Sequence, residues 1–227
     1  MQPMRLPLLL LGLLLTPIAF VANTSAGPDA LIVDPVSAGL GADGIPNGWA
    51  LKQWFGGGHD IRIEKNDEKP VLHMISKQTS FGIYKNFDFD IHDFPYLSWR
   101  WKVTVLPTGG DVRNKKTDDQ AAQVYVLFPK FPSAINTRLV GYLWENLTPK
   151  DLHVTSQKSS NTRYVVLRNH SDPLNTWMEE KRDVLKDYRD LFGGEPPQAG
   201  AVMLMIDSDD TKSNAESYFD ILRFQKE

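Results

Sequence analysis

The residues best suited to chemistry form an acidic turn near the C-terminus, Asp207-Ser208-Asp209-Asp210-Thr211, directly after an apolar run. Carboxylates two residues apart in a turn can converge on a hard cation such as calcium, which takes about six to eight oxygen ligands. The first and last predicted strands, which often pair in β-sandwiches, each carry a further aspartate. The sequence therefore predicts a metal site that could hold structural calcium, made of Asp34, Asp207, Asp209 and Asp220.

A second group of carboxylates lies where loops meet strands. Asp119 stands where a polar loop enters a predicted central strand, and Glu145 stands where another strand ends. Glycoside hydrolysis uses two carboxyl groups, one protonated and one ionised. If the protein is an enzyme, its candidate catalytic residues are therefore Asp119, Glu145 and Asp183. The Glu-x-Asp-x-x-Glu motif of the jelly-roll glucanases is absent from the sequence.

Both acidic groups also have a purely structural interpretation. Aspartate is a common turn residue, and the acidic turn could be paired with Arg182 or Arg223. The second group would then be surface charge, balanced by Lys115, Lys116 and Arg182. The sequence leaves both interpretations open.

Several other function classes are disfavoured. No pair among the five histidines has the spacing of metal ligands, which argues against zinc. The sequence contains no G-x-S-x-G, P-loop or G-x-G-x-x-G motif. A net charge of −3 and the lack of a long basic run give no support to a nucleic-acid partner.

A third group of residues is aromatic and basic. Sugars stack their C–H faces on aromatic rings, and tryptophan is amphipathic enough to line a wet groove. Two strand faces supply the candidates for ligand binding, which are Tyr96, Arg100, Lys102, Tyr142 and Trp144. For the first three of these residues, an ordinary solvated strand face is the alternative.

The element on which the fold is built is the stretch from Tyr96 to Leu106, YLSWRWKVTVL. Its odd positions are apolar and its even positions are polar, which is the period-2 pattern of a half-buried β-strand. The apolar face carries Trp99 and Trp101, which we expect in the core. Residues 121–128 are apolar at nearly every position, as in a central strand that is covered on both faces.

About ten short strands separated by turn residues, without βαβ units, predict an all-β fold. The specific expectation is an antiparallel β-sandwich of the jelly-roll or galactose-binding-like kind. One helix is predicted from Trp177 to Phe192, because Thr176 and Glu179 form a capping box before an apolar stripe. This helix would cover an edge or an open end of the sandwich.

The first 26 residues have the pattern of a secretory signal peptide. Arg5 precedes a leucine-rich run, and Thr24-Ser25-Ala26 supplies small residues for cleavage. The run is too short to span a bilayer comfortably, so no membrane span is expected after cleavage. Export without any cysteine favours a bacterial periplasmic or secreted protein. Residues 27–227 are then a single β-sandwich domain.

Several ordered motifs resemble a bacterial exported family known as domain of unknown function 3047. The motifs, in chain order, are SWRWK at 98–102, DD at 118–119 before QVYV, YLW at 142–144, RDV at 182–184, DY at 187–188, DSDDT at 207–211 and YFDI at 218–221. The resemblance implies an exported protein and assigns no function. More distantly, the closing YFDI strand is similar to that of many carbohydrate-binding β-sandwiches.

Three functions remain open at this point. The sequence favours non-catalytic binding of a carbohydrate or another cell-envelope ligand. The first alternative is a glycan-active hydrolase or lyase that uses acidic loop residues. The second is a module that docks a protein of the cell envelope. A cleft with two converging carboxylates would favour the enzyme, an aromatic groove the binder, and a flat apolar patch the docking module.

Overall fold

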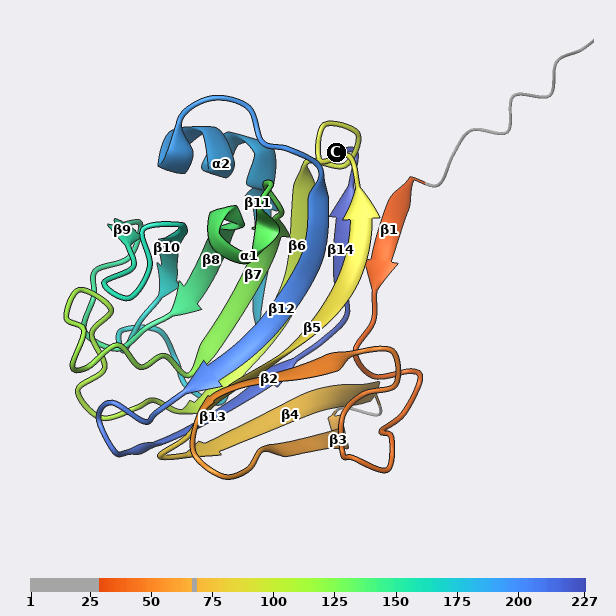
Figure 1. Cartoon of the computed structure of the whole chain (residues 1–227). Coiled ribbons are helices and arrows are strands. Elements are labelled where there is room, and N and C mark those ends of the chain that lie inside the picture. Colours follow the sequence, from red (N-terminus) through yellow and green to blue (C-terminus); the bar gives the residue numbers. More distant parts are fainter. Residues whose placement is uncertain (1–28, 67–68) are drawn as a thin grey trace, which may run out of the picture.

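The computed structural model describes residues 29–66 and 69–227, and these residues form a β-sandwich of two seven-stranded sheets (Figure 1). The predicted signal peptide, residues 1–26, lies outside the described residues. Within them, no helix is long and apolar enough to cross a membrane.

The first sheet, here called the β6 sheet, has the pairing order β1-β14-β6-β13-β4-β3, with β11 on the remaining edge of β6. Its strands are β1 (Ala30–Val33), β3 (Asp60–Asn66), β4 (Lys69–Lys77), β6 (Tyr96–Val105), β11 (Met178–Asp183), β13 (Asn214–Phe219) and β14 (Leu222–Gln225).

The second sheet, here called the β12 sheet, has the order β2-β5-β12-β7-β8-β10-β9. Its strands are β2 (Ala50–Phe55), β5 (Ser80–Phe89), β7 (Ala122–Phe128), β8 (Arg138–Trp144), β9 (His153–Thr155), β10 (Thr162–Arg168) and β12 (Ala199–Asp207). The pair β8–β10 is parallel, and the other strand pairs of the two sheets are antiparallel. The predicted antiparallel β-sandwich is confirmed.

Strand β6 has the alternation that its sequence predicts, with one buried face and one partly exposed face. Trp99 and Trp101 point into the core and contact two aromatic residues of β8. The ring centroids of Trp99 and Tyr142 are 5.3 Å apart, and those of Trp101 and Trp144 are 5.8 Å apart. These edge and tilted contacts join the two sheets, and such pairs add to the stability that simple burial provides.

The helix begins seven residues later than predicted. Helix α2 spans Val184–Phe192 and is capped by Asp183, whose side chain accepts a hydrogen bond from the Lys186 amide. The preceding residues, Met178–Asp183, form β11 along the free edge of β6. Pairing with that edge satisfies backbone groups that a helix would have to satisfy internally, and it overrides the local capping signal.

Helix α2 covers one end of the sandwich (Figure 1). Val184, Tyr188 and Leu191 are buried in the core between the sheets, so α2 packs on the sandwich as expected. A second, one-turn helix, α1 (Ser133–Asn136), lies in the connection between β7 and β8.

Strand β12 is buried on both faces along its whole length. Val202, Leu204 and Ile206 face the core between the sheets. Met203 and Met205 face the other way and belong to a second cluster, here called the outer cluster. Its buried members are Val112, Tyr125, Leu143, Tyr164, Val166, Met203 and Met205. The outer face of the β12 sheet is therefore partly covered by the protein itself.

Candidate ligand-binding groove

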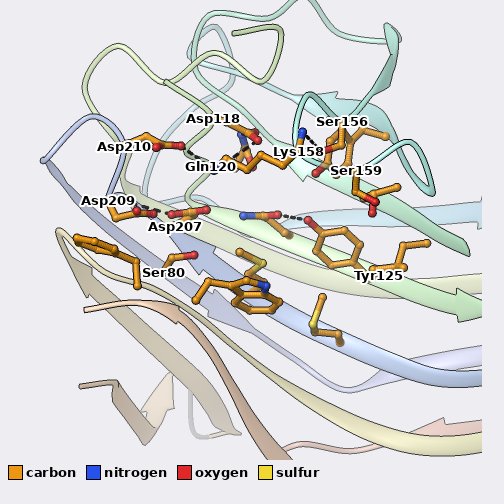
Figure 2. Close-up of a pocket in the computed structure, with 18 residues that line it drawn as sticks. Ser80, Asp118, Gln120, Tyr125, Ser156, Lys158, Ser159, Asp207, Asp209 and Asp210 are labelled. Atoms are coloured by element: carbon orange, nitrogen blue, oxygen red, sulfur yellow. Dashed lines mark hydrogen bonds and ion pairs between the residues drawn. The ribbon is translucent and has the colours of Figure 1, made fainter. Parts of the chain in front are cut away.

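A groove of about 550 Å³ lies on the outer face of the β12 sheet, beside the outer cluster (Figure 2). Strands of the sheet provide its floor, and three loops rise around it. The lining residues are Trp54, Phe55, Ser80, Asp118, Gln120, Gln123, Tyr125, Leu139, Ser156, Lys158, Ser159, Thr162, Tyr164, Met203, Met205, Asp207, Asp209 and Asp210.

The floor of the groove is apolar and aromatic. Tyr125 and Tyr164 meet edge to face with ring centroids 6.2 Å apart, next to Met203 and Met205. Gly141, on the strand between the two tyrosines, makes this contact possible. A Cβ at that position would lie 2.7 Å from Tyr125 and 2.8 Å from Tyr164, closer than van der Waals contact allows.

One side of the groove is formed by two exposed aromatic residues at the end of β2. Trp54 is 47% exposed and Phe55 is 57% exposed. Removing a large aromatic ring from water lowers the free energy. A ring that stays in solvent at the border of a groove can therefore stabilise a bound ligand that covers it. The opposite border is polar and comes from the loop that carries Ser156, Lys158 and Ser159.

The acidic turn closes one end of the groove, and Asp119 holds it in place. The buried carboxylate of Asp119 accepts hydrogen bonds from the backbone amides of Asp210 (3.1 Å) and Thr211 (2.6 Å). Ser208 is also buried, and its hydroxyl lies 2.6 Å from that of Ser76. A carboxylate and a hydroxyl that enter the loop from other elements therefore fix the conformation of the turn.

Three carboxylates converge at this end. Asp119, Asp207 and Asp209 each place an oxygen within 4.8 Å of the other two, an arrangement that could hold a metal ion. Burial raises the pKa of Asp207 well above its usual value, and the neighbouring Asp209 and Asp119 carboxylates raise it further. Among residues 29–66 and 69–227, no lysine, arginine or histidine forms an ion pair with any of the three.

The other two aspartates at this end, Asp118 and Asp210, share one cation. The Lys158 ammonium lies 2.6 Å from Asp210 and 3.6 Å from Asp118 (Figure 2). Burial alone would lower the pKa of Lys158, but its bond to Asp210 and the nearby carboxylates hold this pKa above the usual value. Burial raises the pKa of Asp118, while the Gln120 amide and Lys158 oppose that rise.

Gln123 is the one buried lining residue of the groove with an unpaired amide nitrogen in the described part of the chain. Only 1% of this residue is exposed. Its Oε1 accepts a hydrogen bond from the Tyr125 hydroxyl, but its Nε2 has no partner among residues 29–66 and 69–227. Because a buried donor without an acceptor is costly, this nitrogen indicates where an acceptor on a ligand would be stabilised.

The predicted metal set is only partly brought together. Asp207 and Asp209 converge as expected, with Asp119 as the third member. Asp34 instead accepts hydrogen bonds from Val36 and Ser37 in its own loop. Asp220 lies between β13 and β14 of the β6 sheet and pairs with Arg100 of β6. The prediction failed for these two residues because the pairing of β1 with β14 does not place them near the acidic turn.

The suggested arginine partners of the acidic turn are also elsewhere. Arg182 forms its ion pair with Asp187, and Arg223 lies on β14 of the β6 sheet. The cation that reaches the turn is Lys158, which pairs with Asp210 and leaves Asp207 without a partner cation among the described residues.

The predicted catalytic residues are not assembled into one site. Asp119 is at the acidic end of the groove. The Glu145 carboxylate is buried and accepts hydrogen bonds from the amides of Val112, Asn146 and Thr148, so it organises a loop. Burial raises the pKa of Glu145, and these backbone bonds oppose the rise. Asp183 caps α2.

Two of the predicted ligand-binding residues, Tyr142 and Trp144, are completely buried in the core. A ligand on the surface cannot contact them, so the structure corrects this part of the prediction. They face inward because the alternation of β8 places them opposite the tryptophans of β6.

The other three predicted ligand-binding residues, Tyr96, Arg100 and Lys102, are partly exposed on the outer face of the β6 sheet, away from the groove. Arg100 pairs with Asp220, and Lys102 lies over the Tyr218 ring at 4.2 Å. The Lys181 ammonium lies 4.9 Å from the centre of the Tyr96 ring. Arg100 and Lys102 therefore have partners within the protein, and Arg100 also lines a second cavity of about 340 Å³ on this face.

A comparison with protein-family models identifies the family of the chain. The family model described as protein of unknown function (DUF3047) matches residues 48–223. The chain belongs to this family. The resemblance seen in the sequence motifs is thereby confirmed. A comparison with curated protein sequences gave no match.

Solved structures with a similar arrangement include carbohydrate-binding modules and an enzyme domain. The family 11 carbohydrate-binding module of a cellulosomal cellulase of Clostridium thermocellum has a TM-score of 0.48 and 9% identity, over 88% of this chain and 96% of the module. The xyloglucanase domain of a type three effector from Sinorhizobium fredii, in complex with cellobiose, has a TM-score of 0.46 and 11% identity, over 76% of this chain and 90% of that domain.

Proposed function

We propose that the protein binds a carbohydrate chain, without cleaving it, in the groove on the outer face of the β12 sheet. The observation that carries this proposal is the pair of exposed aromatic residues, Trp54 and Phe55, at the border of a polar groove with an apolar floor. Binding sites for small molecules combine an apolar lining with a few placed polar groups.

The composition of the groove matches the two sides of a sugar ring. Aromatic rings can stack on the C–H faces of a sugar, while hydroxyl, amide and carboxylate groups bond to its hydroxyls. The groove offers all of these within one cavity. Since its carboxylates outnumber its single lysine, Lys158, we expect neutral or cationic glycans to bind and anionic ones to be repelled.

The test is a glycan-array screen of the purified protein, followed by calorimetric titration of the best ligand. Trp54→Ala should weaken binding by about tenfold or more, the effect of losing about 1.4 kcal/mol of contact free energy. Phe131→Ala is the matched control, because Phe131 is 92% exposed and does not line the groove. Equal affinities of the wild type and Trp54→Ala would contradict the proposal.

One observation favours a second function, hydrolysis or lysis of the glycan. Burial raises the pKa of the Asp207 carboxyl group, which lies beside Asp209 in the groove. One protonated and one ionised carboxyl group are what a glycosidase uses. Mass spectrometry of the array ligand after incubation separates the two functions. Intact ligand supports binding alone, whereas cleavage that Asp207→Asn abolishes would support the enzyme.

The predicted calcium ion belongs to the same proposal, now with Asp119 in place of Asp34 and Asp220. An ion that binds only the folded state raises its stability, by about 2.7 kcal/mol at a hundredfold excess over Kd. The melting temperature should therefore rise between EDTA and millimolar calcium. No rise at any calcium concentration would remove the ion from the proposal.

We also propose that the protein is exported to a bacterial periplasm or secreted. The support is the signal-peptide pattern of residues 1–26. Intact-mass analysis of protein recovered from the periplasm should show cleavage near Ala26. A mass that still includes Met1 to Ala26 would contradict export with cleavage.

A further inference from the structure

The acidic end of the groove contains more carboxyl groups than the described part of the protein supplies cations for. Five aspartates gather there, Asp118, Asp119, Asp207, Asp209 and Asp210, around the single ammonium of Lys158. Lys158 forms ion pairs with Asp118 and Asp210. Asp119, Asp207 and Asp209 are left without a cation among the described residues, and like charges this close repel one another.

A divalent cation fits this deficit better than a single ammonium group. The three carboxylates converge within 4.8 Å, and hard cations prefer oxygen ligands. Calcium takes about six to eight oxygens, so three carboxylates leave several positions for other ligands. Asp207 and Asp209 line the groove, so those positions are accessible from the place where a glycan would lie.

Gln123 independently points to a ligand oxygen in the same groove. The unpaired Nε2 of Gln123 is a hydrogen-bond donor. It cannot bind a cation, but an acceptor atom of a ligand would satisfy it. Gln123 and Asp207 line one cavity on neighbouring strands, since Gln123 pairs in register with Met205. A ligand oxygen that accepts from Gln123 can therefore also approach a cation held by Asp207.

We propose that the groove binds its glycan through a calcium ion held by Asp119, Asp207 and Asp209, with Gln123 donating a hydrogen bond to the same sugar. This inference rests on the proposed carbohydrate binding. A sugar hydroxyl has two lone pairs and one proton. One lone pair binds the ion, the other accepts from the Gln123 amide, and the proton is donated to a carboxylate. The ligand class is thus a glycan that presents a free hydroxyl group to this end of the groove.

The experiment compares two affinities, that for calcium and that for the best glycan of the array, by calorimetry. In the wild type, EDTA should lower the glycan affinity at least tenfold while circular dichroism shows an unchanged fold. Asp209→Asn should lower calcium affinity at least tenfold. Asp190→Asn is the matched control, because Asp190 is an exposed aspartate of α2 that pairs with Lys186, and it should change neither affinity.

Gln123→Met separates the ion from the sugar. Methionine keeps the size of glutamine but removes the donor, so calcium affinity should stay the same while glycan affinity falls several-fold. Equal glycan affinity in calcium and EDTA would overturn this inference and leave carbohydrate binding intact. Unfolding in EDTA would make the ion structural and would also overturn it. A folded, calcium-loaded protein that binds no glycan would instead overturn the proposed function.

Discussion

The outer faces of the two sheets are both rich in charge, but they differ in how the charges are satisfied. On the β6 sheet, Arg100 pairs with Asp220 and packs against the Trp177 ring, and Lys102 lies over Tyr218. His73 forms a hydrogen bond through Nε2 with Glu216, and its Nδ1 lies 3.0 Å from Glu64 without the geometry of a hydrogen bond. Each of these side chains has a partner within the protein.

On the β12 sheet, the charges at the acidic end of the groove are only half satisfied. Lys158 is the one cation that pairs with two aspartates, Asp207 has a raised pKa, and the buried Gln123 amide nitrogen has no acceptor in the described part of the chain. Charge or aromatic content alone therefore does not mark a ligand site. Unpaired groups beside a cavity mark it better, because the protein maintains them at a cost in stability.

The largest effect is expected in the core that supports both faces. Trp101→Ala removes a completely buried ring that contacts Trp99 and Trp144. It should lower the free energy of unfolding by ~3–5 kcal/mol, the range for deleting a large buried aromatic side chain. Denaturant titration measures this change. A variant that unfolds like the wild type would show that the two faces do not depend on a shared core.

A smaller effect is expected beneath the groove. Gly141→Ala places a methyl group 2.7 Å from Tyr125 and 2.8 Å from Tyr164, so the rings must move. Overpacking of this kind costs about 1–3 kcal/mol. Glycan binding should weaken together with stability, because the floor of the groove changes shape. Unchanged affinity in the calorimeter would mean that the floor takes no part in binding.

The smallest effect is expected on the paired face. Arg100→Ala breaks the ion pair with the largely buried Asp220. Arg100 is about one-third exposed, so the loss should be only about 1 kcal/mol. Glycan affinity should not change. If Arg100→Ala abolished glycan binding in a folded protein, the β6 face would be the binding site and the comparison would be reversed.

Much of the fold could be predicted from periodicity. The alternation of residues 96–106 and the continuous apolar run at 201–206 gave β6 and β12 almost completely. The start of α2 could not be predicted locally, because β11 forms only by pairing with the distant edge of β6. The sequence did not predict strand β2, because its two large aromatic residues, Trp54 and Phe55, are exposed and line the groove instead of packing in the core.

The candidate site could be predicted only in part. The acidic turn was visible in the sequence, but Asp119 joins it through tertiary contacts such as the Asp207 amide bonding to the Gln120 carbonyl. Lys158 comes from a loop about 50 residues earlier than the Asp210 it neutralises. One local signal was available, because Gln123 is a polar residue within the apolar run of β7.

Binding in the groove, and not on the charged face of the β6 sheet, can be tested by an NMR titration with the best array ligand. The backbone amide shifts that change should cluster around Trp54, Gln123, Tyr164 and Asp209, with little change around Arg100. Shift changes centred on Arg100, with the groove unaffected, would place the glycan on the β6 sheet instead.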